Sequence, residues 1–305
     1  MDGQRLRVGL IGWGAVGSAL GALVQNGPLP LKLACIAVRD RTRAGLPKGV
    51  DIVEPDGALE ADIVVELAGG VDGPLTWARQ ALDRGKPYVT ANKALLATHG
   101  GELARLADRR VAALLGSASV GGGTPMIETV THLAATAAIE RIRGIVNATT
   151  TYILSAMGDG RSYDEALREA QEQGYAEADP RFDVDGRDAA QKLAILASVA
   201  WAKWRPESEV DTTGIVGRAV RFGETVRLVA ESTKEAMSVK PMPLDSTDPL
   251  ARAVGIENVL EVTVADGGVF RVSGPGAGGR VTAGAVYGDL ARLVAGERPI
   301  LFAPR

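Results

Sequence analysis

Short apolar runs alternate with helix-like segments along the first third of the chain. The apolar runs predict strands at Arg7–Ile11, Leu31–Val38, Ile63–Leu67, Tyr88–Thr90 and Val111–Leu115. Between them, apolar residues at helical spacing predict helices at Ala15–Gln25, Thr76–Arg84 and Gly101–Arg109. Strands that are apolar almost throughout and alternate with helices are typical of a parallel sheet covered on both faces. We therefore expect an α/β domain over residues 1–116.

The regular alternation stops after Gly116, where a glycine-rich loop at Ser117–Pro125 begins. Beyond the loop, the pattern predicts a helix at Met126–Ala137, a strand at Ile139–Val146, a helix from the Ser162–Glu165 capping box to Gly174, a helix at Asp188–Ala200, and a hairpin of Val259–Val264 and Val269–Val272. This mixture predicts a separate α+β substrate domain over residues 117–276. The tail at Thr282–Ala295 has helical spacing, and we expect residues 277–305 to pack back on the first domain.

The composition disfavours several classes of partner and of metal site. Of its 305 residues 46% are hydrophobic and 23% charged, and the net charge is −3 without a long run of Lys or Arg. This balance disfavours a nucleic acid or an anionic membrane as partner. The single cysteine, Cys35, excludes an intramolecular disulfide and a zinc site built on several thiolates. No apolar stretch reaches the about 20 residues that span a bilayer, and no signal sequence opens the chain, so we expect a cytoplasmic location.

A glycine fingerprint follows the first predicted strand. Gly12, Gly14 and Gly17 form G-x-G-x-x-G, with Trp13, Ala15 and Val16 between them, at the point where a helix opens. The first glycine permits the tight turn, the second lets the backbone approach a pyrophosphate, and the third lets helix and strand pack closely. Free N–H groups at the positive end of the helix favour the phosphates. The strand-turn-helix context predicts a dinucleotide-binding Rossmann domain with a doubly wound parallel sheet.

The choice of cofactor is expected at the end of the second strand. An acid at this point favours a free ribose 2′-hydroxyl, whereas an arginine accommodates a 2′-phosphate. The strand ends with Val38, Arg39 and Asp40, and Arg41 and Arg43 follow. Arg39 occupies the expected discriminating position, so we favour NADP, while Asp40 keeps NAD possible.

Polar residues are densest between Gly174 and Lys192. Asp188 and Lys192 are four residues apart and share one helix face, and Glu177 and Asp183 precede that helix. Taken alone, this pattern is more typical of a solvated surface loop followed by an ordinary helix salt bridge, and Asp179–Pro180 and Asp185–Gly186 are common turn chemistry.

The segment GYAEADPRFDVDGRDAAQKLAIL at 174–196 resembles the signature of the homoserine dehydrogenases. Further segments match that family in the same order, and they are VVELAGG at 64–70, VTANKALLA at 89–97, ASVGGGTPMI at 118–127, GIVNATTTYIL at 144–154 and GPGAGG at 274–279. The resemblance covers nearly the whole chain. It implies an NAD(P)-dependent oxidoreductase that interconverts L-homoserine and L-aspartate 4-semialdehyde, in a short form without a regulatory domain.

The resemblance also implies roles for single residues. Lys192 matches the lysine that handles the proton at the substrate oxygen, and Asp188 matches its carboxylate partner. Glu177 matches the residue that holds the substrate amino group, assisted by Asp183, and Lys93 would lie between nicotinamide and substrate. The remaining positions implied by the family are Tyr175, Thr149 and Ala148 for the substrate and Ala68, Gly69, Asn92, Ser119, Gly276 and Gly278 for the cofactor.

The family resemblance implies two further partners. Backbone carbonyls of Val120, Gly122 and Thr124 would bind a monovalent cation, Na⁺ or K⁺. Pairing through the sheet of the 255–273 hairpin would give a homodimer.

Three positions depart from the family pattern, and they keep other functions open. Ser117 stands where the family has a glutamate, and Ala148 and Thr151 replace a glycine and an asparagine near the substrate carboxylate. One alternative is a related enzyme for a different hydroxy amino acid or semialdehyde. Another is a catalytically silent dinucleotide-binding regulator, which would have no need of Glu177, Asp188 and Lys192 together.

Overall fold

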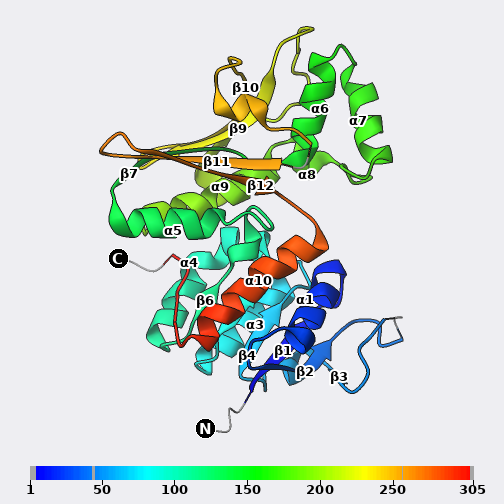
Figure 1. Cartoon of the computed structure of the whole chain (residues 1–305), viewed down its shortest axis with the longest axis vertical. Coiled ribbons are helices and arrows are strands. Elements are labelled where there is room, and N and C mark those ends of the chain that lie inside the picture. Colours follow the sequence, from blue (N-terminus) through cyan, green and yellow to red (C-terminus); the bar gives the residue numbers. More distant parts are fainter. Residues whose placement is uncertain (1–4, 43–44, 256, 303–305) are drawn as a thin grey trace. The chain divides into compact units, whose positions relative to one another are not determined.

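The computed structural model describes residues 5–42, 45–255 and 257–302, and it divides the chain into two compact units (Figure 1). The first unit combines residues 1–123 with 277–305, and the second comprises residues 124–276. The expected division after residue 116 therefore differs from the observed one by seven residues.

The first unit contains a parallel sheet of six strands in the order β3-β2-β1-β4-β5-β6. Its strands are β1 (Leu6–Ile11), β2 (Leu31–Ala37), β3 (Asp51–Val53), β4 (Ile63–Glu66), β5 (Tyr88–Thr90) and β6 (Leu114–Leu115). Its helices are α1 (Ala15–Asn26), α2 (Pro55–Ala58), α3 (Asp72–Asp83), α4 (Lys93–Arg109), the 3₁₀ turn η1 (Ser117–Ser119) and α10 (Gly279–Val294). The strand order reverses direction between β1 and β4, which is the doubly wound arrangement with a switch point expected of a Rossmann domain.

Helix α10 belongs to the core of the first unit although it comes from the end of the chain. It packs beside α1 (Figure 1), and its buried Ala283, Val286 and Leu290 join Leu20 and Val24 in one apolar cluster. Beyond α10, the amide of Leu301 donates to the carbonyl of Leu114 at 2.9 Å, so the tail extends the sheet past β6.

A buried carboxylate joins α10 to η1 and explains where the first unit ends. Asp289 Oδ2 accepts from the Ser117 amide at 3.0 Å, and its Oδ1 accepts from the Ser117 hydroxyl at 2.6 Å. Ser117 and Asp289 are both buried. The turn that begins the glycine-rich loop is therefore held by the first unit, whereas the change of sequence pattern at Gly116 suggested otherwise.

Two elements of the first unit differ from the pattern-based expectation. Helix α4 begins at Lys93 and not at Gly101, because Asn92 caps it through a bond from the Leu95 amide at 3.1 Å. The expected strand at Val111–Leu115 starts only at Leu114, because Val111 is exposed in a left-handed turn with φ 53°.

The second unit contains a mixed sheet in the order β12-β11-β7-β9-β10-β8. Its strands are β7 (Ile139–Ile145), β8 (Val210–Thr212), β9 (Val226–Thr233), β10 (Met237–Pro243), β11 (Glu257–Val264) and β12 (Val269–Pro275). Its helices are α5 (Met126–Thr136), α6 (Ala148–Gly158), α7 (Tyr163–Glu172), α8 (Arg181–Val184) and α9 (Arg187–Ala200), with 3₁₀ turns at Glu207–Glu209 and Pro249–Arg252. All pairs of neighbouring strands are antiparallel except β10 and β8.

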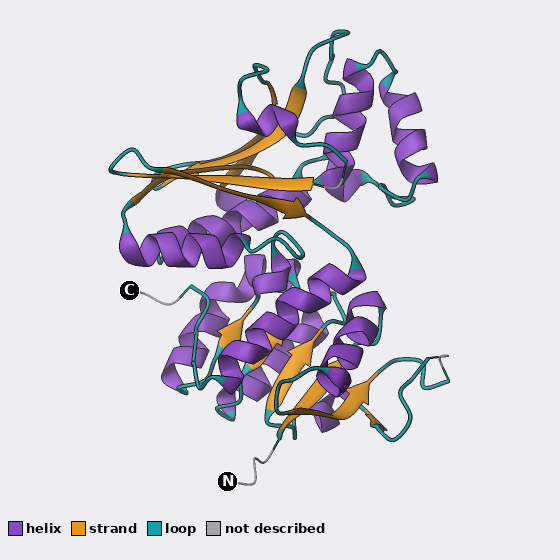
Figure 2. Cartoon of the chain, viewed as in Figure 1, coloured by secondary structure: helices purple, strands orange, loops and turns teal. Residues whose placement is uncertain are grey.

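Helices α5 and α9 pack against each other and on this sheet, as a layer along it in Figure 2. Helix α9 is buried over most of its length, which agrees with its apolar sequence. Helix α7 opens on the expected capping box, with Ser162 and Glu165 bonded reciprocally. Among the described residues, no helix is both long and apolar enough to cross a membrane.

Candidate active site

The glycine turn after β1 has the geometry that a dinucleotide requires. Gly12 has φ +104°, and a Cβ atom there would lie 2.6 Å from the carbonyl carbon of Leu67. A Cβ at Gly17 would lie 2.3 Å from the Gly12 carbonyl oxygen, so this glycine lets α1 approach the turn. A Cβ at Gly14 would meet nothing within 4 Å. The open space at Gly14 lies at the start of α1, where free N–H groups favour phosphate.

A cavity of about 830 Å³ lies at the carboxyl ends of β1, β2 and β4. It brings together seven residues predicted to bind the cofactor, namely Gly12, Trp13, Gly14, Val38, Arg39, Ala68 and Gly69. Val71, the first turn of α3 at Asp72–Pro74 and Trp77 of the same helix also line it. This is the crevice outside the strand ends where doubly wound folds bind their ligands.

The end of this cavity beside β2 carries charges of both signs. Arg39 and Asp40 line it together with Glu54, which follows β3, and Glu54 forms an ion pair with Arg41. The Thr42 amide donates to Asp40 Oδ1 at 2.9 Å, so this carboxylate shapes its own loop. Sequence reasoning did not identify Glu54, because its position is defined by the pairing of β3 with β2.

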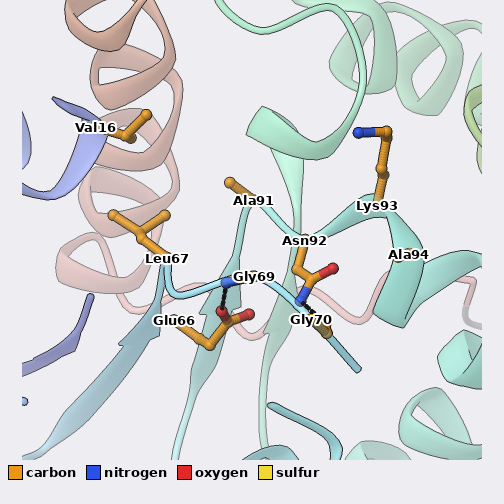
Figure 3. Close-up of a pocket in the computed structure, with 9 residues that line it drawn as sticks. All are labelled: Val16, Glu66, Leu67, Gly69, Gly70, Ala91, Asn92, Lys93 and Ala94. Carbon is orange, nitrogen blue, oxygen red and sulfur yellow. Dashed lines mark hydrogen bonds between the residues drawn. The ribbon is translucent and has the colours of Figure 1, made fainter. Parts of the chain in front are cut away.

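A smaller cavity of about 290 Å³ lies at the ends of β4 and β5 (Figure 3). Its lining residues are Val16, Glu66, Leu67, Gly69, Gly70, Ala91, Asn92, Lys93 and Ala94. Lys93 begins α4, and Asn92 Nδ2 donates to the Gly70 carbonyl at 2.6 Å, so the two loops that form the cavity are linked.

Four other predicted cofactor residues of the first unit have packing or hydrogen-bonding roles. Gly17 contacts the turn, and the Ala15 carbonyl lies 3.0 Å from the Cβ position of Gly279. Ser119 is buried and its hydroxyl donates to the Gly116 carbonyl at 2.6 Å. Gly278 has φ +118° and precedes α10.

In the second unit, Lys192 lies in a nearly closed polar cluster on α9. Its ammonium donates to Asp188 Oδ2 and to the Val146 carbonyl, both at 2.7 Å. The Lys192 side chain is 14% exposed and that of Asp188 7%. Of the three ammonium donors, two are thus used within the described part of the unit, which leaves one for a substrate oxygen.

Asn147 connects this pair with Asp183. Its Nδ2 donates to Asp188 Oδ2 at 2.8 Å and to Asp183 Oδ1 at 2.7 Å, and its Oδ1 accepts from the Thr150 amide at 2.8 Å as the cap of α6. Asn147 was not among the predicted site residues. Its preference for helix N-termini is a sequence signal that could have indicated the cap but not the two carboxylates.

Asp183 is held at the edge of the cluster. Its Oδ2 and the Tyr175 carbonyl both accept from the Thr149 hydroxyl, at 3.2 Å and 2.6 Å. The pKa of Asp183 is raised, mainly because the carboxyl group is buried. The nearby charge of Asp188 also raises this pKa, whereas the hydrogen bond from Asn147 lowers it. Gly186, with φ +82°, makes the turn between α8 and α9 that places Asp183 and Asp188 together.

Other members of the acidic segment are not brought into the cluster. Glu177 is exposed, and its backbone carbonyl accepts from Gln171 Nε2 at 3.1 Å. Asp179 is exposed and pairs with Arg181, which lowers the pKa of Asp179 to about 2. Among the described residues, no three His, Cys, Asp or Glu side chains gather as a metal site.

Two sequence families match the chain. One is described as "Homoserine dehydrogenase, NAD binding domain" and matches residues 12–115. The other is described as "Homoserine dehydrogenase" and matches residues 125–291. The chain belongs to the homoserine dehydrogenase family.

Individual family members resemble the chain over nearly its full length. The homoserine dehydrogenase of Mycobacterium tuberculosis is 39% identical, with 95% of this chain and 72% of the relative covered. That of Bacillus subtilis is 34% identical, with 97% and 74% covered. Among solved structures, a homoserine dehydrogenase from Thiobacillus denitrificans has a TM-score of 0.89 at 31% identity and covers 95% of this chain and 73% of its own. A hyperthermophilic archaeal homoserine dehydrogenase in complex with NADPH has a TM-score of 0.87 at 30% identity, with 97% and 99% covered.

These matches confirm three expectations from the sequence. The family resemblance is correct, and the Rossmann sheet with a second mixed α/β unit is the family fold. The activity class, an NAD(P)-dependent homoserine dehydrogenase, is also confirmed.

Proposed function

We propose that the chain interconverts L-homoserine and L-aspartate 4-semialdehyde with Lys192 at the reacting oxygen. The observation that supports this most is the cluster of Lys192, Asp188 and Asn147. Asp188 and the Val146 carbonyl fix the ammonium by two bonds of 2.7 Å, and one donor is left for the substrate. A fixed ammonium in a nearly enclosed place can stabilise the charge that develops on a carbonyl oxygen during reduction and can donate its proton to it.

The cluster supplies the proton that the aldehyde oxygen takes up during reduction. When bound, the reduced nicotinamide supplies a hydride to the aldehyde carbon, one proton joins the aldehyde oxygen, and the cofactor is left oxidised. Lys192 stabilises the negative charge that develops on the oxygen and donates this proton. Asp188 and Asn147 hold Lys192 in place, so that little reorganisation accompanies the charge development.

The remaining assignments in the second unit follow the family. We propose that Asp183 and Glu177 bind the substrate ammonium group and that Tyr175, Thr149 and Ala148 border the substrate. Support comes from the carboxylate of Asp183, which Asn147 holds beside Asp188. Glu177 is exposed in the turn between α7 and α8, where a substrate can recruit it.

In the first unit, we propose that the two cavities hold the dinucleotide, with Lys93 beside the nicotinamide. The seven predicted residues along the larger cavity and Lys93 in the smaller one support this. We favour NADP because Arg39 lines the cavity beyond β2. Glu54 and Asp40 lie in the same lining, and their charge favours measurable use of NAD as well.

We also keep two partners as proposals. The carbonyls of Val120, Gly122 and Thr124 are proposed to bind Na⁺ or K⁺, since carbonyl oxygens suit such cations and φ values of +79° at Gly121 and +58° at Gly122 bend this loop sharply. The β11–β12 hairpin is proposed to pair with a second copy, because β12 is an edge strand with partly exposed Val269 and Phe270. Gly276 follows β12 and packs on Asn258, and we keep it, with Gly278, among the positions proposed for the cofactor.

A related enzyme for another hydroxy amino acid is the second candidate. Thr151, which replaces the family asparagine, is buried and donates its hydroxyl to the Asn147 carbonyl at 2.9 Å. This hydroxyl is used within its own helix and is not available to a substrate as the asparagine amide would be. The observation favours a changed contact at the substrate carboxylate.

A spectrophotometric panel at 340 nm separates these readings. We expect the purified protein to reduce NADP, and NAD less efficiently, with L-homoserine, and we expect Lys192→Ala to remove nearly all turnover. Lys203→Ala, an exposed lysine in the same unit, serves as the matched control and should retain wild-type rates. Unchanged turnover in Lys192→Ala would contradict the mechanism. Activity confined to another hydroxy amino acid would favour the second candidate, and cofactor binding without any turnover would indicate a silent regulator.

A further inference from the structure

Glu66 is a fully buried carboxylate at the end of β4 that the mechanism above does not use. Its Oε1 accepts from the amides of Ala68 and Gly69 at 2.7 and 2.9 Å, and its Oε2 accepts from the Thr90 hydroxyl at 2.7 Å. Figure 3 shows Glu66 under the loop that it holds. An apolar strand gives no reason for a charged residue at this point, so the carboxylate requires a separate explanation.

The bonding pattern is that of an ionised carboxylate. All three partners donate to Glu66, and the Thr90 oxygen in turn accepts from the Asn92 amide at 2.9 Å. A carboxylate accepts only, which matches this set. The pKa of Tyr88 is raised, first by the burial of this side chain and then by the negative charge of Glu66.

The position of Glu66 in the sheet places this charge at one end of the dinucleotide crevice. The glycine turn lies at the end of β1, and Arg39 follows β2 at the far side of the larger cavity. A dinucleotide with its adenosine half over β2 extends its nicotinamide half across the switch point towards β4 and β5. Glu66 lines the smaller cavity, which lies at the ends of these two strands.

We propose that Glu66 is an electrostatic determinant of the cofactor's redox state, whose buried charge stabilises the oxidised, positively charged nicotinamide over the neutral reduced one. This inference rests on the proposed placement of the dinucleotide. A buried charge acts through less screening than an exposed one, and the two loop amides fix its position. In aldehyde reduction, Glu66 therefore stabilises the positive charge that the ring acquires as the hydride leaves.

The test compares the dissociation constants of oxidised and reduced cofactor in two matched variants. Glu66→Gln keeps the shape and the acceptor for the loop amides but removes the charge. Thr90→Val removes a bond from the same network and keeps the charge. Both constants are measured by fluorescence titration or calorimetry, with NADP and NADPH, and 2′-phospho-ADP-ribose, which lacks the nicotinamide, serves as a reference ligand.

We expect Glu66→Gln to raise the ratio of the NADP constant to the NADPH constant by about three- to tenfold. Thr90→Val should change both constants by a similar factor and so leave the ratio unchanged. Lys93 is the same in all variants, so its charge does not affect the comparison. The reference ligand should bind the wild type and Glu66→Gln alike. An unchanged ratio in Glu66→Gln would overturn the proposal, as would an equal rise in both variants.

Two further outcomes are distinguishable. If 2′-phospho-ADP-ribose and ADP-ribose both fail to bind the wild type, the proposed dinucleotide placement fails and Glu66 loses its role with it. If Glu66→Gln does not fold, as judged by circular dichroism, Glu66→Asp replaces it. This shorter side chain draws the charge back from the loop and should raise the ratio by about twofold, and a ratio equal to that of Thr90→Val would overturn the proposal.

Discussion

The three glycines of the fingerprint share one motif but differ in what surrounds them. Gly12 is needed for its φ of +104°, and Gly17 for its contact with the Gly12 carbonyl. Gly14 has an ordinary backbone conformation and open space around its Cβ position. Nothing in the protein itself requires a glycine there, so the requirement comes from the ligand.

Gly14→Ala should therefore separate folding from binding. We expect the thermal midpoint of the free protein to stay within about 2 °C of the wild type, since the methyl group meets no protein atom. Affinity for NADP should fall by about tenfold or more, because the methyl group points to where the pyrophosphate approaches. Gly12→Ala is the control and should lower the midpoint itself. Wild-type affinity in Gly14→Ala would contradict the placement of the phosphates.

Asp183, which we propose binds the substrate, lowers the stability of the folded protein when it is ionised. Burial raises its pKa above the ordinary value of 3.8. Between pH 3.8 and the raised pKa, the folded protein holds a proton that the unfolded chain has released. The stability of the folded state therefore decreases as the pH rises through this window.

Asp183→Asn should remove this pH-dependent decrease in stability and should weaken catalysis. The difference between the thermal midpoints at pH 4 and pH 7 should be smaller in the variant than in the wild type, because the neutral amide has no proton to release. KM for homoserine should rise about tenfold if Asp183 binds the substrate ammonium group. Asp179→Asn, on the exposed Arg181 pair, is the control and should leave KM unchanged. An unaltered KM in Asp183→Asn would remove it from the substrate site.

At the scale of elements, the contact between α10 and η1 decides where the first unit ends. Asp289 holds both the amide and the hydroxyl of Ser117, and all three groups are buried. A serine at position 117 thus receives a carboxylate from α10, although it replaces the glutamate that the family pattern predicts there. The loop 117–123 is anchored at its beginning by a helix that lies more than 150 residues later in the chain.

Asp289→Ala should loosen this anchor. Two buried donors of Ser117 would lose their acceptor, at a cost of about 1–3 kcal/mol for each unpaired group. We expect a thermal midpoint several degrees lower, with faster hydrogen exchange at Ser117–Ser119. Asp289→Asn keeps one acceptor oxygen and should lose less, and Ser117→Ala should lose only the hydroxyl bond. Equal stability of Asp289→Ala and the wild type would show that the turn is held by other contacts.

At the scale of the whole molecule, the edge strand β12 is the feature that favours association with a second chain. Its neighbour on one side is β11, and its other side pairs with no strand of the described chain. Val269 and Phe270 on it are 43% and 46% exposed. An exposed apolar edge of this kind favours association with a second chain.

We expect light scattering after gel filtration to give twice the mass of one chain. Val269→Lys combined with Phe270→Lys should shift the protein towards the monomer, because charged residues on an edge strand oppose pairing. Phe222→Lys changes an 84% exposed residue in another loop of the same unit and should leave the mass unchanged. A monomeric wild type, or a dimer that survives the double change, would contradict pairing through β12.

The sequence by itself determined the parts whose physics is local. Apolar strands alternating with helices and glycines at fixed spacing specified the Rossmann unit, because sheet packing and the phosphate turn require these residues nearby in the chain. The i, i+4 spacing placed Asp188 and Lys192 on one helix face. The match to GYAEADPRFDVDGRDAAQKLAIL specified the family and its chemistry.

Only the tertiary structure decided which distant residues meet. Glu66 and Thr90, Ser117 and Asp289, and Asn147 with both Asp183 and Asp188 lie far apart in the sequence. Their partners are brought close by strand order and helix packing, which no local pattern records. A polar residue at the end of an apolar strand looks the same whether it is exposed to solvent or buried, and burial with its hydrogen-bond partners is what gives Glu66 and Asn147 their roles.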